Sequence, residues 1–198
     1  MEILVVSGTP GTGKTTISNN VSNCIEANVV SLNELAISEN LIEKYDSKRE
    51  TSVINNKKIV EYIIGLIEEY KNKENPKFLI IESHFSDIVP EQYINFVIIL
   101  RCEPDELYTR LKSRGYKEEK IRENVQSEIL GNSVNYFLNK PLNVPILEID
   151  TTNRSIESVS KTIIDILMKK IDSNDYIVGK VDWLEKLFQE DRLEKFFD

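Results

Sequence analysis

Short apolar runs alternate with longer amphipathic stretches along most of the chain. The runs are rich in Ile and Val, and they predict strands at residues 3–6, 29–31, 78–81, 96–100 and 146–149. Apolar positions at helical spacing predict helices at residues 14–26, 32–40, 57–73, 104–113, 118–138 and 156–170. Ser31 and Glu34 give an S-x-x-E pattern, which predicts a capping box at the start of the second helix. This alternation predicts an α/β fold, a doubly wound parallel sheet with helices on both faces.

A short polar break at residues 173–175 separates the last predicted helix from a final amphipathic stretch at residues 179–188. We therefore predict a domain at residues 1–172 and a C-terminal helical extension at residues 173–198. Such an extension either packs back on its own domain or docks a partner, and packing back is the simpler expectation.

Length and charge exclude several classes of protein. A chain of 198 residues fits one compact domain, and none of its apolar runs approaches the ~20 residues that a bilayer requires. The N-terminus lacks the basic region of a signal peptide, so we expect a cytoplasmic protein. The formal net charge of −8 disfavours broad nucleic-acid binding, whereas it suits a basic protein partner.

The strongest chemical pattern is G-x-x-x-x-G-K-T at residues 8–15, which follows a predicted strand and opens a predicted helix. In this context Gly11 and Gly13 let backbone N–H groups point at phosphate oxygens, and the helix N-terminus adds partial positive charge. Lys14 would reach the β- and γ-phosphates of ATP, Thr15 would ligate Mg²⁺, and Thr16 would contact the α-phosphate.

Two polar residues follow the third predicted strand. Glu82 ends its apolar run, where a carboxylate would hold a water of the Mg²⁺ shell. His84 is the only histidine of the chain, and its ordinary pKa lies close to physiological pH, so it could position or activate a water or an acceptor hydroxyl. We predict catalytic roles for both.

Arg114 and Gly115 interrupt two helical patterns and predict a short lid. Phosphoryl transfer needs cations around the migrating group, and a lid arginine would supply one while excluding water. Arg110 and Arg122 lie on the flanking helices, where we expect surface or ion-pair roles.

Residues 1–170 resemble the adenylate kinase isoenzyme six type of the nucleoside monophosphate kinases, also described as the coilin-interacting nuclear ATPase family. The matching stretches are GTPGTGKTT at residues 8–16, ESH at 82–84, YD at 45–46, and RGYKEEKI and ENV within residues 111–129. The segment VDW at residues 181–183 resembles archaeal members.

The resemblance implies a five-stranded parallel sheet, a monophosphate-binding insertion near residues 33–56 and a lid near residues 113–123. It implies adenylate kinase activity (ATP + AMP ⇌ 2 ADP) and ATP hydrolysis, with a role in maturation of small-subunit ribosomal RNA through a basic ribosomal protein. It also implies that Gly11, Gly13, Lys14, Thr15 and Thr16 contact ATP, that Arg114 is the lid cation and that His84 is the catalytic-loop histidine. We predict that Lys14, Glu82, His84 and Arg114 act in catalysis.

Two positions depart from the family pattern. Glu82 replaces an Asp, and Ile37 stands where several relatives have an arginine, which leaves Lys44, Lys48 and Arg49 as cations for an acceptor phosphate. Two other functions therefore stay open: a small-molecule or nucleotide kinase with a different acceptor, and a nucleotide-dependent switch with little catalysis. By analogy of fold, the backbone near residues 151–154 would hold adenine.

Overall fold

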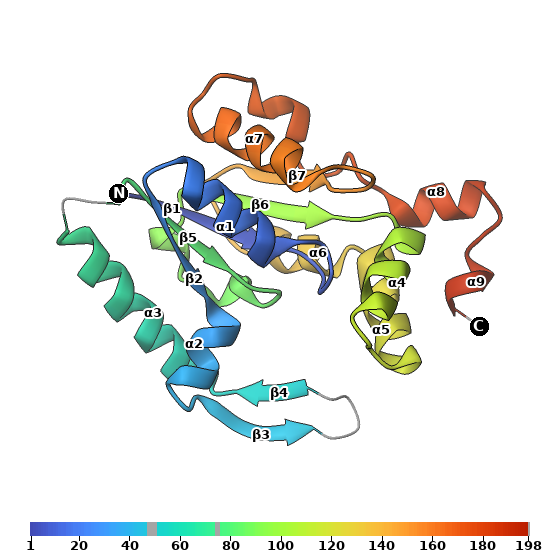
Figure 1. Ribbon diagram of the computed structural model, residues 1–198, viewed down its shortest axis with the longest axis horizontal. Coiled ribbons are helices and arrows are strands. Elements are labelled where there is room, and N and C mark those ends of the chain that lie inside the picture. Colours follow the sequence, from blue (N-terminus) through green and yellow to red (C-terminus); the bar gives the residue numbers. More distant parts are fainter. Residues whose placement is uncertain (47–50, 74–75, 198) are drawn as a thin grey trace.

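Figure 1 shows the computed structural model of the chain, which describes residues 1–46, 51–73 and 76–197. Lys48 and Arg49, two of the candidate cations for an acceptor phosphate, lie outside the described residues.

A five-stranded parallel sheet forms the centre of the molecule, in the order β2-β5-β1-β6-β7. Because β1 pairs with β5 on one side and with β6 on the other, the order reverses at β1. The predicted doubly wound sheet is confirmed, and every predicted strand lies within an observed one: β1 (Glu2–Ser7), β2 (Ala27–Ser31), β5 (Phe78–Glu82), β6 (Phe96–Arg101) and β7 (Ile146–Asp150).

Side chains of each strand alternate between two apolar cores, one on each face of the sheet. Ile3 and Val5 of β1 contribute to the first core, whereas Leu4 and Val6 contribute to the second. The first core is covered by α2 (Leu32–Ser38), α3 (Asn56–Lys71) and α6 (Asn132–Leu138), and the second by α1 (Lys14–Cys24) and α7 (Ile156–Leu167). Helices on both faces explain why the strands are almost uniformly apolar.

Two local predictions are wrong. The single helix expected at residues 118–138 is two helices, α5 (Glu118–Ile129) and α6, because Gly131 takes the left-handed conformation with φ of 65° and turns the chain. The capping box is absent as well. Ser31 is the N-cap residue of α2, but its side chain makes no capping hydrogen bond.

An antiparallel hairpin of β3 (Ile42–Asp46) and β4 (Thr51–Ile54) follows α2 and stands away from the central sheet. The apolar pattern did not predict it, because both strands are short and mix polar with apolar residues. The hairpin lies in the segment that the family resemblance assigns to acceptor binding.

The C-terminal extension packs against α4 (Pro104–Ser113) and α5. Trp183 and Leu187 of α8 (Trp183–Gln189) and Phe196 of α9 (Glu194–Phe197) are buried in a third apolar core with residues of those two helices. The division of the chain at residue 172 stays a prediction. Across the described ranges, no helix has both the length and the apolar content needed to cross a bilayer.

Candidate functional site

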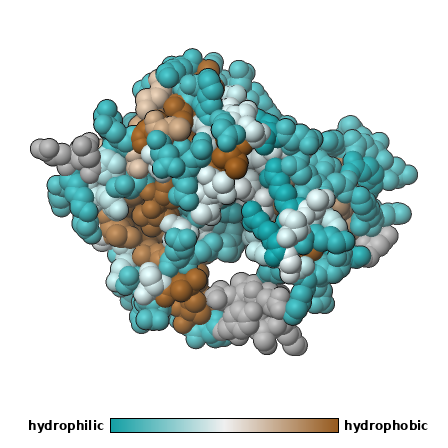
Figure 2. All heavy atoms as spheres, viewed as in Figure 1, coloured by the Kyte–Doolittle hydropathy of each residue, from teal (hydrophilic) through white to brown (hydrophobic). Residues whose placement is uncertain are grey.

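A cavity of about 820 Å³ opens at the carboxyl end of β1, where the strand order reverses. Ligands of doubly wound folds bind in the crevice at such a reversal. The residues that line it come from the loop after β1, α2, the β3-β4 hairpin, the end of β5, the α4–α5 junction, α5 and α6. Figure 2 shows a hollow on this face, with apolar residues gathered on one side and hydrophilic residues on the other.

The loop between β1 and α1 has the backbone geometry that its glycines predict. Gly8 has φ of 138°, and a Cβ there would lie 2.4 Å from the carbonyl oxygen of Leu100. Gly13, the N-cap residue of α1, has φ of 100°. Side chains are excluded at both positions, so the loop wraps tightly and presents the helix N-terminus to the cavity. Gly11, Lys14, Thr15 and Thr16 line the same cavity, as predicted for a phosphate cradle.

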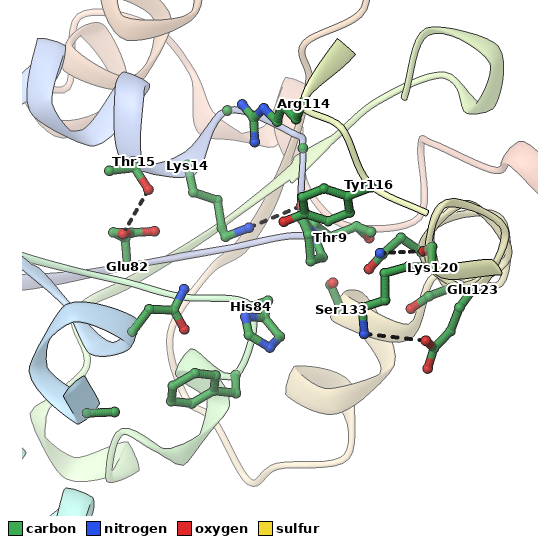
Figure 3. Close-up of a pocket in the computed structure, with 18 of the residues that line it drawn as sticks. Thr9, Lys14, Thr15, Glu82, His84, Arg114, Tyr116, Lys120, Glu123 and Ser133 are labelled. Carbon is green, nitrogen blue, oxygen red and sulfur yellow. Dashed lines mark hydrogen bonds and ion pairs between the residues drawn. The ribbon is translucent and has the colours of Figure 1, made fainter. Parts of the chain in front are cut away.

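Lys14 extends from the start of α1 into the site, and its Nζ donates a hydrogen bond of 3.1 Å to the carbonyl oxygen of Thr9 (Figure 3). The residue is only 8% exposed. Burial lowers its pKa from 10.5 to about 8, against the opposing influence of the Glu82 and Glu128 carboxylates, while the charge of Arg114 lowers it further. A buried ammonium group with so few partners is poised to bind an anion.

Thr15 and Glu82 meet where α1 begins and β5 ends. Glu82 lies beside Val6 in the sheet register, and the Thr15 hydroxyl donates to its Oε1 over 3.0 Å. Glu82 is 1% exposed, and its Oε2 has no hydrogen-bond partner in the described part of the chain. Unpartnered buried carboxylate oxygens are costly, so this oxygen fits a bound cation or its water.

The residues present therefore fit Mg²⁺ held together with a phosphate. The described ranges contain no group of three or more His, Cys, Asp or Glu side chains able to hold a metal. Mg²⁺ in phosphotransfer sites takes one or two protein ligands and completes its shell with waters and substrate phosphates. Thr15 and Glu82 supply such a pair.

His84 is half-buried in the loop after β5. Its ring packs edge-to-face against Phe85, with 5.0 Å between the ring centroids. Burial lowers its pKa to about 4, and the positive charges of Lys14 and Lys120 contribute in the same direction. The imidazole of the ligand-free site is therefore neutral at physiological pH, and its role in positioning or activating a water or acceptor hydroxyl stays a prediction.

The arginines of the predicted lid occupy different places. Arg114 ends α4, lines the cavity and is exposed, beside Gly115 with φ of 76°. Arg122 forms an exposed ion pair with Glu118, as expected. Arg110 forms an ion pair with Glu106 at 2.5 Å, as expected, and its guanidinium also donates to the carbonyl oxygens of Gly11, at 3.5 Å, and Thr151, at 3.0 Å. It thereby ties α4 to the phosphate-binding loop.

The opposite wall of the cavity is largely apolar. Ile37 is 65% exposed, and it lines this wall together with Ala36, Ile42, Ile54 and Phe85. Among the described lining residues, the cations are Lys14, Arg114 and Lys120, all outside this wall. Lys44 is exposed on β3 and is not among the lining residues, and residues 151–154 do not line the cavity either.

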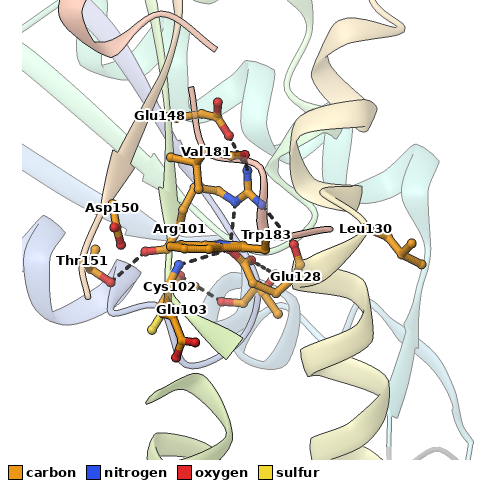
Figure 4. A network of polar contacts seen from close by, with 12 residues as sticks. Arg101, Cys102, Glu103, Glu128, Leu130, Glu148, Asp150, Thr151, Val181 and Trp183 are labelled. Carbon is orange, nitrogen blue, oxygen red and sulfur yellow. Dashed lines mark hydrogen bonds and ion pairs between the residues drawn. The ribbon is translucent and has the colours of Figure 1, made fainter. Parts of the chain in front are cut away.

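Sequence reasoning missed Glu128, Arg101 and Trp183, which form a buried polar network behind the loop (Figure 4). Glu128 recurs with Ile121 and Val125 on the buried face of α5. A carboxylate on the apolar side of an amphipathic helix was the signal that could have found it.

Known proteins resemble this chain in both sequence and fold. A family model described as an AAA domain matches residues 4–131, which span the phosphate-binding loop, Glu82, His84 and the lid. The chain belongs to this family.

Archaeal relatives cover nearly the whole length of the chain. A protein of Methanocaldococcus jannaschii named "Putative adenylate kinase" is 35% identical over 185 residues, covering 93% of this chain and 94% of the relative. A protein of the same name from Thermococcus onnurineus is 36% identical over 186 residues, covering 93% and 92%.

Two kinases are among the solved structures that share this fold. Shikimate kinase from Bacteroides thetaiotaomicron superposes with a TM-score of 0.56 at 12% identity, covering 84% of this chain and 98% of that one. Deoxyadenosine kinase from M. mycoides with bound dATP gives a TM-score of 0.53 at 18% identity, covering 84% and 99%. At these identities the likeness establishes the fold of this AAA-domain chain.

Proposed function

We propose that the chain is a Mg²⁺-dependent phosphotransferase with adenylate kinase (ATP + AMP ⇌ 2 ADP) and ATPase activity. The observation that carries this proposal is the pairing of Thr15 with Glu82, whose second carboxylate oxygen is buried with no hydrogen-bond partner among the described residues and whose charge acts on Lys14. In phosphoryl transfer the protein mainly positions the reacting groups and places positive charge around the transferred phosphoryl group. This site offers both.

Each lining residue has a role in the proposed reaction. The backbone of Gly11 and Gly13 and the side chain of Thr16 bind the phosphates of ATP, and Lys14 neutralises the β- and γ-phosphates. Thr15 and Glu82 would hold Mg²⁺, which would offset the negative charge of the phosphates.

Arg114 and His84 complete the catalytic set that we propose. Arg114 is exposed at the α4–α5 junction and can fold over the transferred phosphoryl group as a lid cation. His84 is neutral in the free site, so it serves as a hydrogen-bonding group that orients an acceptor oxygen or a water. Nucleotide phosphates would add negative charge beside it and make it a better base.

The choice of AMP as acceptor is supported by the names and near full-length coverage of the archaeal relatives. The motif resemblance to the isoenzyme six type supports ATP hydrolysis and a role in ribosome biogenesis, in the processing of small-subunit rRNA. A net charge of −8 suits the basic small-subunit ribosomal protein proposed as the partner.

One observation favours a second candidate, a kinase acting on an acceptor other than AMP. The wall around Ile37 is apolar, and the cations of the described lining lie elsewhere in the cavity. An acceptor phosphate would need a cation on that wall, whereas an uncharged acceptor would not.

Formation of ADP from Mg-ATP tests these functions together. It is measured with the protein alone, with each nucleoside monophosphate in turn, and with a basic small-subunit ribosomal protein. Stimulation by AMP above the other monophosphates supports adenylate kinase activity, and turnover without acceptor supports ATPase activity. No stimulation by any monophosphate would contradict the adenylate kinase assignment and would leave the kinase with a different acceptor as the candidate. Lack of binding to the ribosomal protein would contradict the assembly role.

A further inference from the structure

Glu128 is the residue on which the network behind the phosphate-binding loop converges. It lies on α5 and is 1% exposed. Its Oε2 accepts a hydrogen bond of 2.5 Å from the hydroxyl of Thr9, which belongs to the loop. Its Oε1 accepts from Arg101 Nε at 2.8 Å, from the Cys102 N–H at 3.1 Å and from Trp183 Nε1 at 3.2 Å. Both carboxylate oxygens therefore accept hydrogen bonds within the fold.

The charges of this network make it a poor source of stability. Arg101 pairs with both Glu128 and Glu148, and all three side chains are almost completely buried. Removing three charges from water costs free energy that their mutual attraction recovers only partly, and apolar side chains of similar volume often serve stability better. The gain from such a network lies in fixed geometry, because each oxygen has directional partners.

Thr9 connects this network to the catalytic lysine. Its hydroxyl donates to Glu128, while its carbonyl oxygen accepts from Lys14 Nζ at 3.1 Å and from Thr12 Oγ1 at 2.9 Å. A shift of the Thr9 backbone would therefore move the acceptor of both hydrogen bonds at once. Glu128 anchors Thr9 through its hydroxyl, and the Thr9 carbonyl in turn holds Lys14 Nζ in the free site.

The C-terminal extension supplies part of the same network. Trp183 is 6% exposed, and its indole N–H points at Glu128 (Figure 4). The Val181 carbonyl accepts from Arg101 at 3.2 Å, and the Gly179 N–H donates to Glu148 at 2.6 Å. Three hydrogen bonds from this short stretch thus end on the charged side chains that hold the loop.

We propose that Glu128 is a positioning residue of the nucleotide site, which fixes the loop through Thr9, and that Trp183 of the C-terminal extension completes its hydrogen bonds. The inference rests on the proposed binding of Mg-ATP. It gives the extension a function in nucleotide binding, although the extension does not line the cavity.

Thr9→Val tests the central link, because valine keeps the volume of threonine and removes only the hydroxyl. We measure the Kd of Mg-ATP by calorimetry and the midpoint of thermal unfolding. The expected result is a rise in Kd of about tenfold, the size of one charge-assisted hydrogen bond. Thr9→Ser keeps the hydroxyl and should restore the wild-type Kd. Thr162→Val is the matched control, since it removes a buried hydroxyl on α7, and should leave Kd unchanged.

Trp183→Phe tests the extension and leaves every group of the loop in place, so it also serves if Thr9→Val fails to fold. It should raise the Kd severalfold. Trp183 is the only tryptophan, so its emission should change when Mg-ATP binds to the wild type and stay constant in Thr9→Val at saturating Mg-ATP. Wild-type Kd values in Thr9→Val and Trp183→Phe would overturn the proposal. A wild-type protein that binds no Mg-ATP would overturn the proposed function itself.

Discussion

Thr15 donates a hydrogen bond of 3.0 Å to Glu82 across 67 residues of sequence, and the second oxygen of that carboxylate is buried without a described partner. This relationship joins the start of α1 to the end of β5 at the point where the strand order reverses. Glu82 is buried and Thr15 is exposed on the cavity, in the place where a Mg²⁺ ion with a bound phosphate would need them.

Glu82→Gln preserves the shape of the side chain and removes its charge. We expect turnover of Mg-ATP to fall by about 10²-fold, because a preorganised electrostatic contact at the metal would be lost. The measurement is kcat as a function of Mg²⁺ concentration, in which the variant should require more Mg²⁺. Glu61→Gln, on the exposed side of α3, is the matched control, and an equal loss in both variants would contradict the assignment.

Arg114→Ala should lower kcat by about 10- to 10²-fold and leave the Kd of Mg-ATP nearly unchanged, since a lid cation acts mainly on the transition state. The side chain is exposed, so we expect no loss of stability. Steady-state kinetics and calorimetry separate the two parameters. Arg122→Ala on α5 is the control, and a rise in Kd with kcat intact would show that Arg114 binds ATP without acting in transfer.

His84 should titrate near pH 4 in the free protein and at higher pH when Mg-ADP is bound, because the phosphates offset the positive charge of Lys14. The chain has one histidine, so a single imidazole signal in NMR spectra reports this pKa without assignment. A free-protein value near 6.5 would contradict the burial described for this ring.

The same shift makes the stability of the fold depend on pH. Between about pH 4 and pH 6.5 the unfolded chain binds a proton at His84 that the folded chain does not. The contribution of His84 to the free energy of unfolding is therefore fully present above pH 6.5, and it is lost as the pH falls from about 6.5 to about 4. Urea unfolding of the wild type and of His84→Gln should converge at high pH and diverge at low pH, with the wild type losing more stability.

Lys14 predicts a pH dependence of the opposite sign for binding. Its pKa of about 8 means that most molecules carry a neutral Lys14 amine above that pH, and a neutral amine attracts phosphate weakly. The groups that act on Lys14 are Glu82, Glu128 and Arg114. We expect the affinity for Mg-ADP to decline as the pH rises through 8, with proton uptake on binding, which calorimetry in buffers of different ionisation enthalpy measures. An affinity that does not change between pH 7 and pH 9.5 would contradict this pKa.

Local patterns were sufficient for the parts of the site that lie close together in sequence. The loop at residues 8–16 and the strand that ends at Glu82 follow from backbone and strand rules that act over a few residues. The sheet itself follows from alternation, since parallel strands covered on both faces must be apolar.

The remainder depends on contacts that no local pattern contains. Glu128 meets Thr9 across 119 residues and Trp183 across 55, so only the folded chain shows that they share one carboxylate. The pKa of His84 depends on burial by distant segments, which a sequence does not give. Gly131 ends α5 by taking the left-handed conformation, with φ of 65°, although the apolar spacing continues through it.

Transfer of the labelled γ-phosphate from Mg-ATP, with AMP as acceptor, tests the central claim most directly when wild type and Lys14→Ala are compared. Lys161→Ala on the exposed side of α7 is the matched control. We predict labelled ADP and labelled inorganic phosphate from the wild type and the control, and neither above background from Lys14→Ala. Equal transfer by Lys14→Ala and the wild type would contradict the account.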